Sequence, residues 1–304
     1  MKRTHPKVSL RRGFERLRLK LNEPFEVSEA IAIFGSPRSG TTWLMESLGQ
    51  LPGYVSIFEP LHSNWFPASE RLGFTPRTYL AKDHVCEDKR LYFERIFQGR
   101  VMSQAPHFKT RSILGRLSND KILVKFIRAN RMIPWILNNF KLKGNIIIVR
   151  HPCSTIASQL KTGIDGYLLG DHVHPSKETV LQEGREFLPE KILGGLEEIK
   201  TKEEILAAIW SMDQYVPLQE GLSFIKYEDL LLETERTLSA ILKGLHQEEQ
   251  LTRVMKNIDV PSLFTKDLRS KKEEQLGKWK QYLSKGQTED ILGVVELFDI
   301  ELYP

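Results

Sequence analysis

The chain has 304 residues, of which 40% are hydrophobic and 27% charged, and its formal net charge is +5. This composition can bury a large core and predicts one α/β domain, while the modest positive charge favours an anionic ligand without requiring nucleic acid. Two cysteines, Cys86 and Cys153, are too few for a disulfide framework and lack the spacing of a zinc site, so reduced thiols in a cytoplasm are the simplest interpretation.

The N-terminal segment is strongly basic. Eight Lys or Arg residues stand against one acidic residue, Glu15, within the first twenty positions. Because no long apolar stretch follows, the segment is predicted to be neither a signal peptide nor a membrane anchor. We expect residues 1–29 to form a solvated arm before a single domain at 30–304. Weak contact of the arm with an anionic membrane surface is the alternative.

A strand, a glycine loop and a helix are predicted in succession from residue 30. Residues 30–34 form an unbroken apolar run, typical of a strand buried on both faces, and helical periodicity begins at Thr41. Gly35 and Gly40 bracket the loop, so its N–H groups and the helix N-terminus can approach a phosphate. Thr41 stands where a triphosphatase P-loop has lysine, and the cation lies upstream at Arg38. Triphosphate hydrolysis is therefore disfavoured.

The loop resembles the 5′-phosphosulfate-binding loop of sulfotransferases that use 3′-phosphoadenosine-5′-phosphosulfate (PAPS). Residues 37–43 read Pro-Arg-Ser-Gly-Thr-Thr-Trp, and arginine in the second position is closer to the carbohydrate and tyrosylprotein branches than to the cytosolic branch. The resemblance implies a P-loop-type three-layer α/β fold with a mainly parallel central sheet flanked by helices. A plain glycine-serine turn is the alternative. The donor contacts implied are Gly35, Pro37, Arg38, Ser39, Gly40, Thr41, Thr42 and Trp43.

A second strand is predicted at 54–58, and it ends in Glu-Pro-Leu-His. Ligands of open α/β sheets bind beyond the carboxyl ends of the strands, so a carboxylate there is a candidate functional group. A Phe-Glu-Pro motif supplies the catalytic base in carbohydrate sulfotransferases, and the resemblance gives that role to Glu59. The alternative is a helix cap or a surface partner. His62 is a second candidate base, and the irregular stretch 63–118 is where we expect acceptor selection.

A third strand is predicted at 121–126, with Lys125 near its end and Arg128 just beyond. The resemblance implies that Lys125 contacts the sulfuryl group or its bridging oxygen. The cytosolic branch has a catalytic histidine two positions later, where this chain has Ile127, and that difference leaves the base role to Glu59. Arg128 could neutralise the donor, bind an acidic acceptor, or be a solvated residue at a helix start.

A fourth strand, at 145–149, leads into Arg150 and a helix that begins near Pro152. Where a Walker B strand would end in aspartate for magnesium, a guanidinium recruits an anion. Arg150 and Ser158 resemble the 3′-phosphate site of the family, in which arginine binds in fork geometry and serine adds a hydrogen bond. The alternative is a strand-end arginine paired with a carboxylate.

The second half of the chain carries weaker patterns. A helix at 203–219 is expected to pack against the sheet, and a strand at 222–226 precedes one helix that runs to about residue 245. The resemblance places Tyr227 beside the adenine. It also implies that a basic group ahead of Trp279 covers the 3′-phosphate, although a charged loop is the alternative. A terminal helix is expected at 290–298. The basic group is Arg269, Lys271 and Lys272.

The resemblance implies a cytoplasmic enzyme that moves a sulfuryl group in-line from PAPS to an acceptor hydroxyl or amine. Glu59 would take the acceptor proton, while Arg38 and Lys125 stabilise developing charge. The acceptor would be a small molecule, lipid or carbohydrate. A His-x-His pattern at 172–174 lacks a third ligand, so no metal is predicted. The alternatives are a magnesium-dependent nucleotide kinase and a non-enzymatic module that binds polyanions with strong salt dependence.

Overall fold

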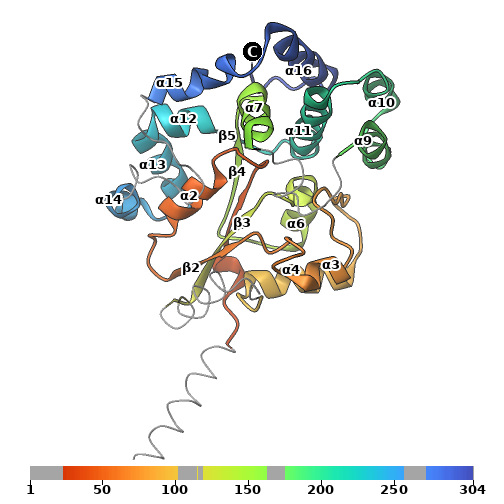
Figure 1. Ribbon diagram of the computed structural model, residues 1–304. Helices are drawn as coiled ribbons and strands as arrows, with labels where there is room; N and C mark the ends of the chain where they lie inside the picture. The colour runs from red at the N-terminus through yellow and green to blue at the C-terminus, as the bar shows by residue number, and fades with distance from the viewer. Residues whose placement is uncertain (1–22, 102–114, 116–118, 163–174, 257–271, 304) are drawn as a thin grey trace, which may run out of the picture.

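A single parallel sheet organises the described part of the chain (Figure 1). The computed structural model describes residues 23–101, 115, 119–162, 175–256 and 272–303. Five strands in these ranges pair in the order β2-β3-β1-β4-β5, and every pair is parallel. The strands are β1 (Ile31–Phe34), β2 (Tyr54–Phe58), β3 (Lys121–Phe126), β4 (Gly144–Val149) and β5 (Ile225–Lys226).

The register brings the carboxyl ends of the strands to one edge. Phe34, the last residue of β1, is aligned with Phe126 of β3 on one side and Ile147 of β4 on the other. Phe58, the last residue of β2, is aligned with Lys125. After β1 the chain crosses to β2 on one side of the sheet, and it later adds β4 on the other side. Such a reversal marks the crevice in which open α/β sheets bind ligands, so the end of β1 is the natural place for a site.

Helices cover both faces of the sheet and give the three layers. One face packs against α3 (Pro67–Arg71), α4 (Glu87–Phe97) and α6 (Ile133–Asn139). The other face packs against α2 (Thr41–Leu48), α12 (Tyr227–Leu232), α13 (Thr234–Gly244) and α14 (Leu251–Met255). The α/β fold with a parallel sheet between helices is thus confirmed.

A third group of helices packs around the end of β4 and gathers at the top of Figure 1. Its members are α7 (Pro152–Thr162), α9 (Lys177–Gly184), α10 (Glu190–Leu196), α11 (Lys202–Gln219) and α16 (Lys285–Leu297). The short α15 (Lys272–Gly277) contacts α12. The remaining short turns are the 3-10 helices η1 (Val27–Glu29), η2 (Asn130–Met132), η3 (Glu248–Gln250) and η4 (Lys278–Gln281).

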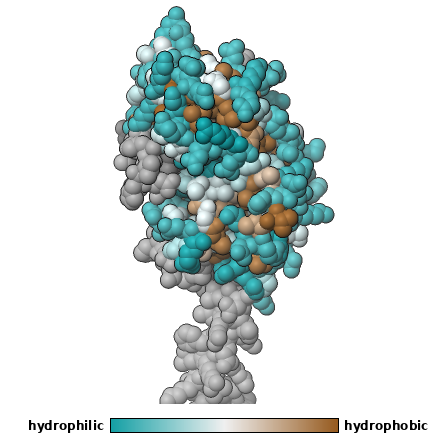
Figure 2. Space-filling view, turned by 90° about the vertical axis from the view of Figure 1, so that its right-hand side faces the viewer, coloured by the Kyte–Doolittle hydropathy of each residue, from teal (hydrophilic) through white to brown (hydrophobic). Residues whose placement is uncertain are grey.

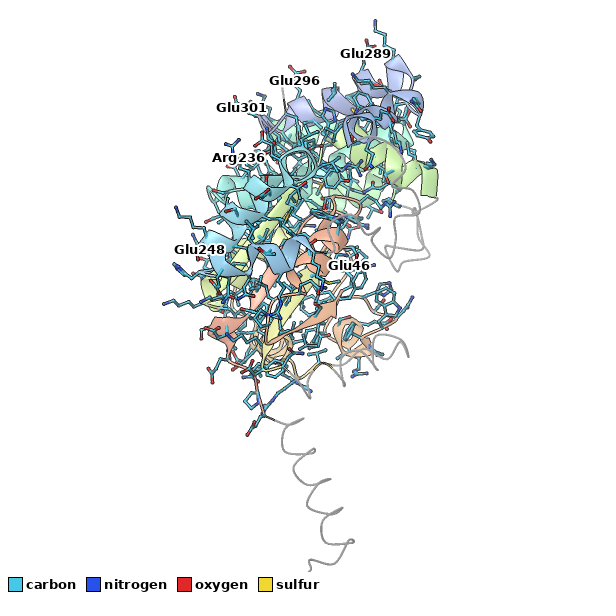
Figure 3. All side chains as sticks on the ribbon, turned by 90° about the vertical axis from the view of Figure 1, so that its left-hand side faces the viewer. Glu46, Arg236, Glu248, Glu289, Glu296 and Glu301 are labelled. Carbon is cyan, nitrogen blue, oxygen red and sulfur yellow. The ribbon has the colours of Figure 1, made fainter. Side chains whose placement is uncertain are left out.

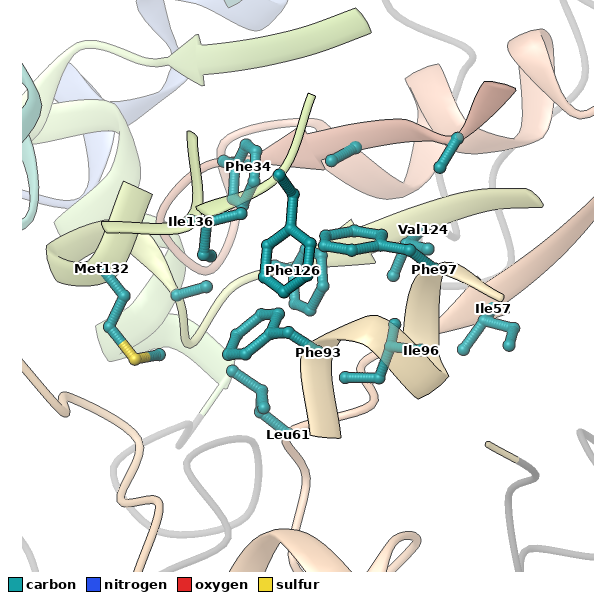
Figure 4. Close-up of a cluster of buried hydrophobic side chains, with 14 of the residues drawn as sticks. Phe34, Ile57, Leu61, Phe93, Ile96, Phe97, Val124, Phe126, Met132 and Ile136 are labelled. Atoms are coloured by element: carbon teal, nitrogen blue, oxygen red, sulfur yellow. The ribbon is translucent and has the colours of Figure 1, made fainter. Parts of the chain in front are cut away.

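The alternation of side chains in β1 explains its unbroken apolar run. Ala32 and Phe34 belong to the core beneath α4 and α6, whereas Ile31 and Ile33 belong to the core beneath α2 and α13. A strand that is covered on both faces needs apolar residues at every position. The first core is rich in aromatic rings: Phe34 stacks on Phe126 with ring centres 5.3 Å apart (Figure 4).

Three predicted elements differ from those observed. The strand expected at 222–226 shortens to β5, because Leu222 is held by the end of α11, where its N–H donates to the Pro217 carbonyl. The single helix expected from 227 to about 245 is two helices, broken at Glu233, where the Thr234 hydroxyl bonds the Leu231 carbonyl. The terminal helix begins at Lys285, ahead of the expected residue 290, because Ser284 caps it.

Charged side chains on the outer helices point into solvent, as Arg236, Glu248 and Glu296 do in Figure 3. The face in Figure 2 is covered mostly by hydrophilic residues. Across the described ranges, no helix is both long enough and apolar enough to cross a bilayer. The expected arm lies mostly outside the described residues, although Phe25 near its end is buried in the core.

Candidate active site

Several charged side chains are buried where the strands end, against the usual rule. Glu59, Lys125 and Arg128 are each at most 3% exposed. Charged residues are almost never fully buried unless they are paired or serve a function. Glu59 follows β2, and the other two residues lie at and beyond the end of β3. They therefore lie at the edge to which the register also brings the end of β1.

The glycine loop between β1 and α2 fits closely against its neighbours. A Cβ atom on Gly35 would lie 2.6 Å from the Ile148 carbonyl oxygen and 2.7 Å from the Ser39 hydroxyl. Gly40 has φ +94°, and a Cβ there would lie 2.4 Å from the Tyr227 ring. Neither position can take a side chain without displacing the loop or the ring. Glycine at both ends thus allows the tight path by which the loop enters α2.

The residues predicted to hold the two ends of the donor lie together. Arg38 Nε donates a hydrogen bond to the Ser158 hydroxyl at 3.0 Å, and Arg150 Nη1 donates to the Arg38 carbonyl at 3.1 Å. The Arg150 guanidinium also lies over the Tyr227 ring, 4.6 Å from its centre. Two segments that are distant in sequence, residues 150–158 and Tyr227, therefore meet at the glycine loop. Their roles in binding stay predictions.

The electrostatics of this convergence favour an anion. Burial lowers the pKa of Arg38, and the nearby Arg150 charge lowers it further. Arg150 Nε and the Ser39 hydroxyl are buried and have no hydrogen-bond partner within the described residues. Buried polar groups in native proteins are nearly always satisfied, so an orphaned donor on Arg150, whose charge lies near Arg38, is chemically suited to an anion.

A compact ion cluster lies beside the loop. Lys125 Nζ is 2.7 Å from Glu59 Oε1, and Arg128 Nη1 donates to Glu59 Oε2 at 3.3 Å. The Ile127 N–H donates to the same Oε2 at 3.2 Å. Burial lowers the pKa of Lys125, and the Glu59 carboxylate opposes that effect. The cluster fixes one carboxylate between two cations, with an excess of positive charge.

The backbone at Glu59 is in the left-handed region, with φ +51°, and Arg38 shares this feature with φ +76°. Non-glycine residues held in this region cost about 1–3 kcal/mol each and cluster at functional sites. Glu59 is neither a helix cap nor a surface partner, because it is 1% exposed and α3 begins only at Pro67. Arg128, equally buried, is not a solvated helix start.

His62 has the environment of a neutral imidazole. Its ring stacks on Trp65 with ring centres 4.0 Å apart. Burial and the Arg128 charge lower the pKa of His62 from 6.5 to about 4. At neutral pH the ring is therefore uncharged, and its low basicity makes it a weaker proton acceptor than an unperturbed histidine.

Replacing His62 by glutamine should make stability less sensitive to acid. Because the pKa of His62 is near 6.5 in the unfolded chain and about 4 in the folded one, its stabilising effect is complete above pH 6.5. The effect is lost as the pH falls through 4, since the unfolded state takes up the proton first. Urea unfolding from pH 7.5 to 4 measures the slope, with the exposed His84→Gln as control. Equal slopes in wild type and His62→Gln would contradict the assignment.

The other predicted residues are placed as follows. Pro37 and Thr41 are buried, and Thr42 and Trp43 are half-buried in the first turn of α2. Arg269 and Lys271 lie outside the described residues, as do His172 and His174, and of Lys272 only the backbone, at the start of α15, is described. Trp279 stacks on His151, the residue after Arg150, with ring centres 5.4 Å apart.

The sequence did not point to the buried ion pair between Arg131 and Asp213, whose Nε and Oδ1 atoms are 3.0 Å apart. A signal was present. Asp213 lies on the apolar stripe of α11 with Leu206, Trp210 and Pro217, all of them buried, so an acidic residue interrupts a core-facing row. Such a residue requires a buried partner, although the sequence does not name it.

Within the described ranges, no three His, Cys, Asp or Glu side chains lie close enough together to hold a metal ion. The prediction of a reaction without metal stays a prediction.

Comparison with known proteins gave structural neighbours only, because no family model and no curated protein matches the chain. The chain is similar in structure to the sulfotransferase domain from the Synechococcus PCC 7002 olefin synthase, with 15% identity, 90% of this chain and 96% of that chain covered, and a TM-score of 0.47. It is also similar to the sulfotransferase domain from the curacin biosynthetic pathway, with 17% identity, 90% and 99% covered, and a TM-score of 0.44. Such identities and TM-scores assign neither an activity nor a substrate to this chain.

Proposed function

We propose that this chain is a sulfotransferase that transfers a sulfuryl group from PAPS to an acceptor hydroxyl or amine. The observation that carries the proposal is the meeting of Arg38, Arg150 and Ser158 at a glycine loop without the P-loop lysine. The Arg150 charge lies near enough to lower the pKa of Arg38, and Arg150 Nε is a buried donor without a partner among the described residues, so an anion of high charge suits this position. A nucleotide with phosphate groups at both its 3′ and 5′ positions is such an anion.

The donor would lie across the ends of β1 and β4. The loop amides and the N-terminus of α2 suit the 5′-phosphosulfate, while Arg150 and Ser158 suit the 3′-phosphate. The Tyr227 ring packs against Gly40 and lies under the Arg150 guanidinium, so we assign it to contact the adenine. Arg269, Lys271 and Lys272 remain candidates for the 3′-phosphate.

The ion cluster supplies the chemistry that transfer needs. Glu59 takes the proton of the acceptor hydroxyl as its oxygen forms a bond to sulfur. The bond between sulfur and the 5′-phosphate oxygen breaks, and its electron pair leaves with adenosine 3′,5′-bisphosphate. Lys125 and Arg38 donate hydrogen bonds toward the oxygens on which negative charge grows. The buried Glu59–Lys125 pair is the feature that a simple polyanion-binding module would not need.

The finer parts of the proposal follow from the same residues. Glu59 in a Phe-Glu-Pro sequence, with Ile127 in place of histidine, favours the carbohydrate and tyrosylprotein branches as the nearer relatives. We propose a small-molecule, lipid or carbohydrate acceptor, and action in a cytoplasm without a metal ion.

Calorimetry with adenosine 3′,5′-bisphosphate and with ATP tests the donor. We expect the bisphosphate to bind more tightly than ATP and without magnesium. A magnesium-dependent preference for ATP would favour a kinase. Equal, strongly salt-dependent binding of both nucleotides would favour a polyanion-binding module, and no binding would also remove the sulfotransferase assignment.

The same titration on Arg150→Ala tests the 3′-phosphate assignment. We expect the Kd for the bisphosphate to rise about 10-fold or more, the scale of one charged hydrogen bond. Arg236→Ala, which removes an exposed arginine on α13, is the matched control and should leave the Kd unchanged. An unchanged Kd in Arg150→Ala would refute the assignment.

A further inference from the structure

Helix α11 contacts both segments that approach the proposed donor site. Asp213 Oδ2 accepts a hydrogen bond from the Ser36 hydroxyl at 3.1 Å, and Gln214 Nε2 donates to that hydroxyl at 2.9 Å. One turn earlier, Trp210 Nε1 donates to the Arg150 carbonyl at 3.2 Å. A single rigid helix therefore holds the start of the glycine loop and the end of β4.

The single proton of the Ser36 hydroxyl is used by these contacts. The hydroxyl donates to Asp213 and accepts from Gln214, and all three side chains are buried. Such a hydroxyl has little capacity left for a ligand, so its role is to fix the loop from behind. The Ser36 carbonyl in turn accepts the Ser39 N–H at 3.1 Å, which sets the turn that leads to Gly40.

Asp213 belongs to a network with balanced charge. Arg131 Nε lies 3.0 Å from Asp213, Arg131 Nη1 lies 2.8 Å from Glu183, and Glu183 lies 2.8 Å from Arg77. Two acidic and two basic groups alternate, so the network offers no net charge to an anion. In this it differs from Arg38 and Arg150, whose charges are of one sign.

Arg131 places the network next to the ion cluster along the chain. It lies in η2, the turn directly after Arg128, and Asn130 of the same turn lies 3.5 Å from Asp213 through its Nδ2 atom. The carboxylate of Asp213 thus joins the glycine loop to the segment that follows Lys125. The distance between the two is fixed by buried contacts, which deform little.

We propose that Asp213 is a positioning residue that acts through Ser36 to hold the glycine loop in its anion-binding shape and in register with the end of β3. The expected effect on nucleotide binding rests on the proposed function, whereas the expected effect on the amide exchange of the loop does not. Asp213 touches neither donor nor acceptor. Its removal should loosen the loop and weaken binding of adenosine 3′,5′-bisphosphate.

The test compares Asp213→Asn, Ser36→Ala and the double variant with wild type. Ser69→Ala, which removes a buried hydroxyl on α3, is the matched control. The first measurement is amide hydrogen exchange of the segment 35–41 in the free protein. We expect exchange to accelerate about 10-fold in both single variants and no further in the double variant, because Asp213 acts through Ser36. Ser69→Ala should leave the segment unchanged.

The second measurement is the Kd for adenosine 3′,5′-bisphosphate, by calorimetry. A Kd raised about 10-fold, again without additivity in the double variant, supports the proposal. Unchanged exchange in 35–41, or additive losses, would overturn it. If wild type binds no bisphosphate, the proposed function fails, and the exchange measurement still decides the role of Asp213. Ser36→Ala alone serves if Asp213→Asn does not fold.

Discussion

Glu59→Gln is expected to lower the rate of sulfuryl transfer by about 10²–10⁴-fold, the usual contribution of a general base. The amide keeps the size of the side chain and an oxygen that can accept from Arg128 and the Ile127 N–H, but it cannot take a proton. The Kd for adenosine 3′,5′-bisphosphate should change little, because Glu59 is not assigned to the donor. Single-turnover transfer from labelled donor measures the rate, and calorimetry measures the Kd.

The matched control for this variant is Glu220→Gln, which removes a surface carboxylate that pairs with Lys82. It should leave both quantities unchanged. A Glu59→Gln enzyme with full activity would contradict the assignment of the base. Such a result would return the base role to His62, whose pKa of about 4 is close to that of an ordinary carboxylate, or to another group that the acceptor contacts.

The central sheet could be predicted because its signals are local. Parallel strands covered on both faces favour apolar runs, and short runs of this kind placed β2 and β3 at their observed bounds, although Ser56 interrupts the first and Lys125 the second. The short β5 could not be predicted in this way. Its bounds depend on how the end of α11 holds Leu222, which is a contact between elements and not a property of the run itself.

The residues of the candidate site fall into the same two groups: those marked by a local sequence pattern, and those whose contacts form only in the folded chain. The glycine loop and the charges at the strand ends are contiguous patterns, so the sequence indicated Arg38, Glu59 and Lys125. The hydrogen bond between Arg38 and Ser158 spans 120 positions. The resemblance named both residues but assigned them to two separate phosphate pockets, so it did not predict their contact. The partner of Asp213 lies 82 positions away, in a turn whose arginines look like surface residues in sequence. Charge pairing over such distances appears only once the chain is folded.

Lys125→Met is the second variant with a large expected effect. Methionine fills nearly the same volume without charge, and loss of one preorganised donor at the leaving oxygen should lower the transfer rate by about 10²–10³-fold. Lys82→Met, at an exposed lysine, is the matched control. Single-turnover kinetics measure the effect. A rate within a few-fold of wild type would leave Arg38 as the main group opposing the developing charge.

The same variant should also lose stability, since it leaves Glu59 buried with Arg128 as its remaining cationic partner. Removing one partner of a buried ion pair costs up to about 3–5 kcal/mol, and we expect a smaller loss here because Arg128 still balances the Glu59 carboxylate. Urea unfolding of Lys125→Met and of the control Lys82→Met measures the difference. A Lys125→Met enzyme that is fully folded in the assay and still slow would separate the chemical role of Lys125 from its role as the counter-charge of Glu59, whereas a rate loss that matches the unfolded fraction would mean that the loss came from misfolding.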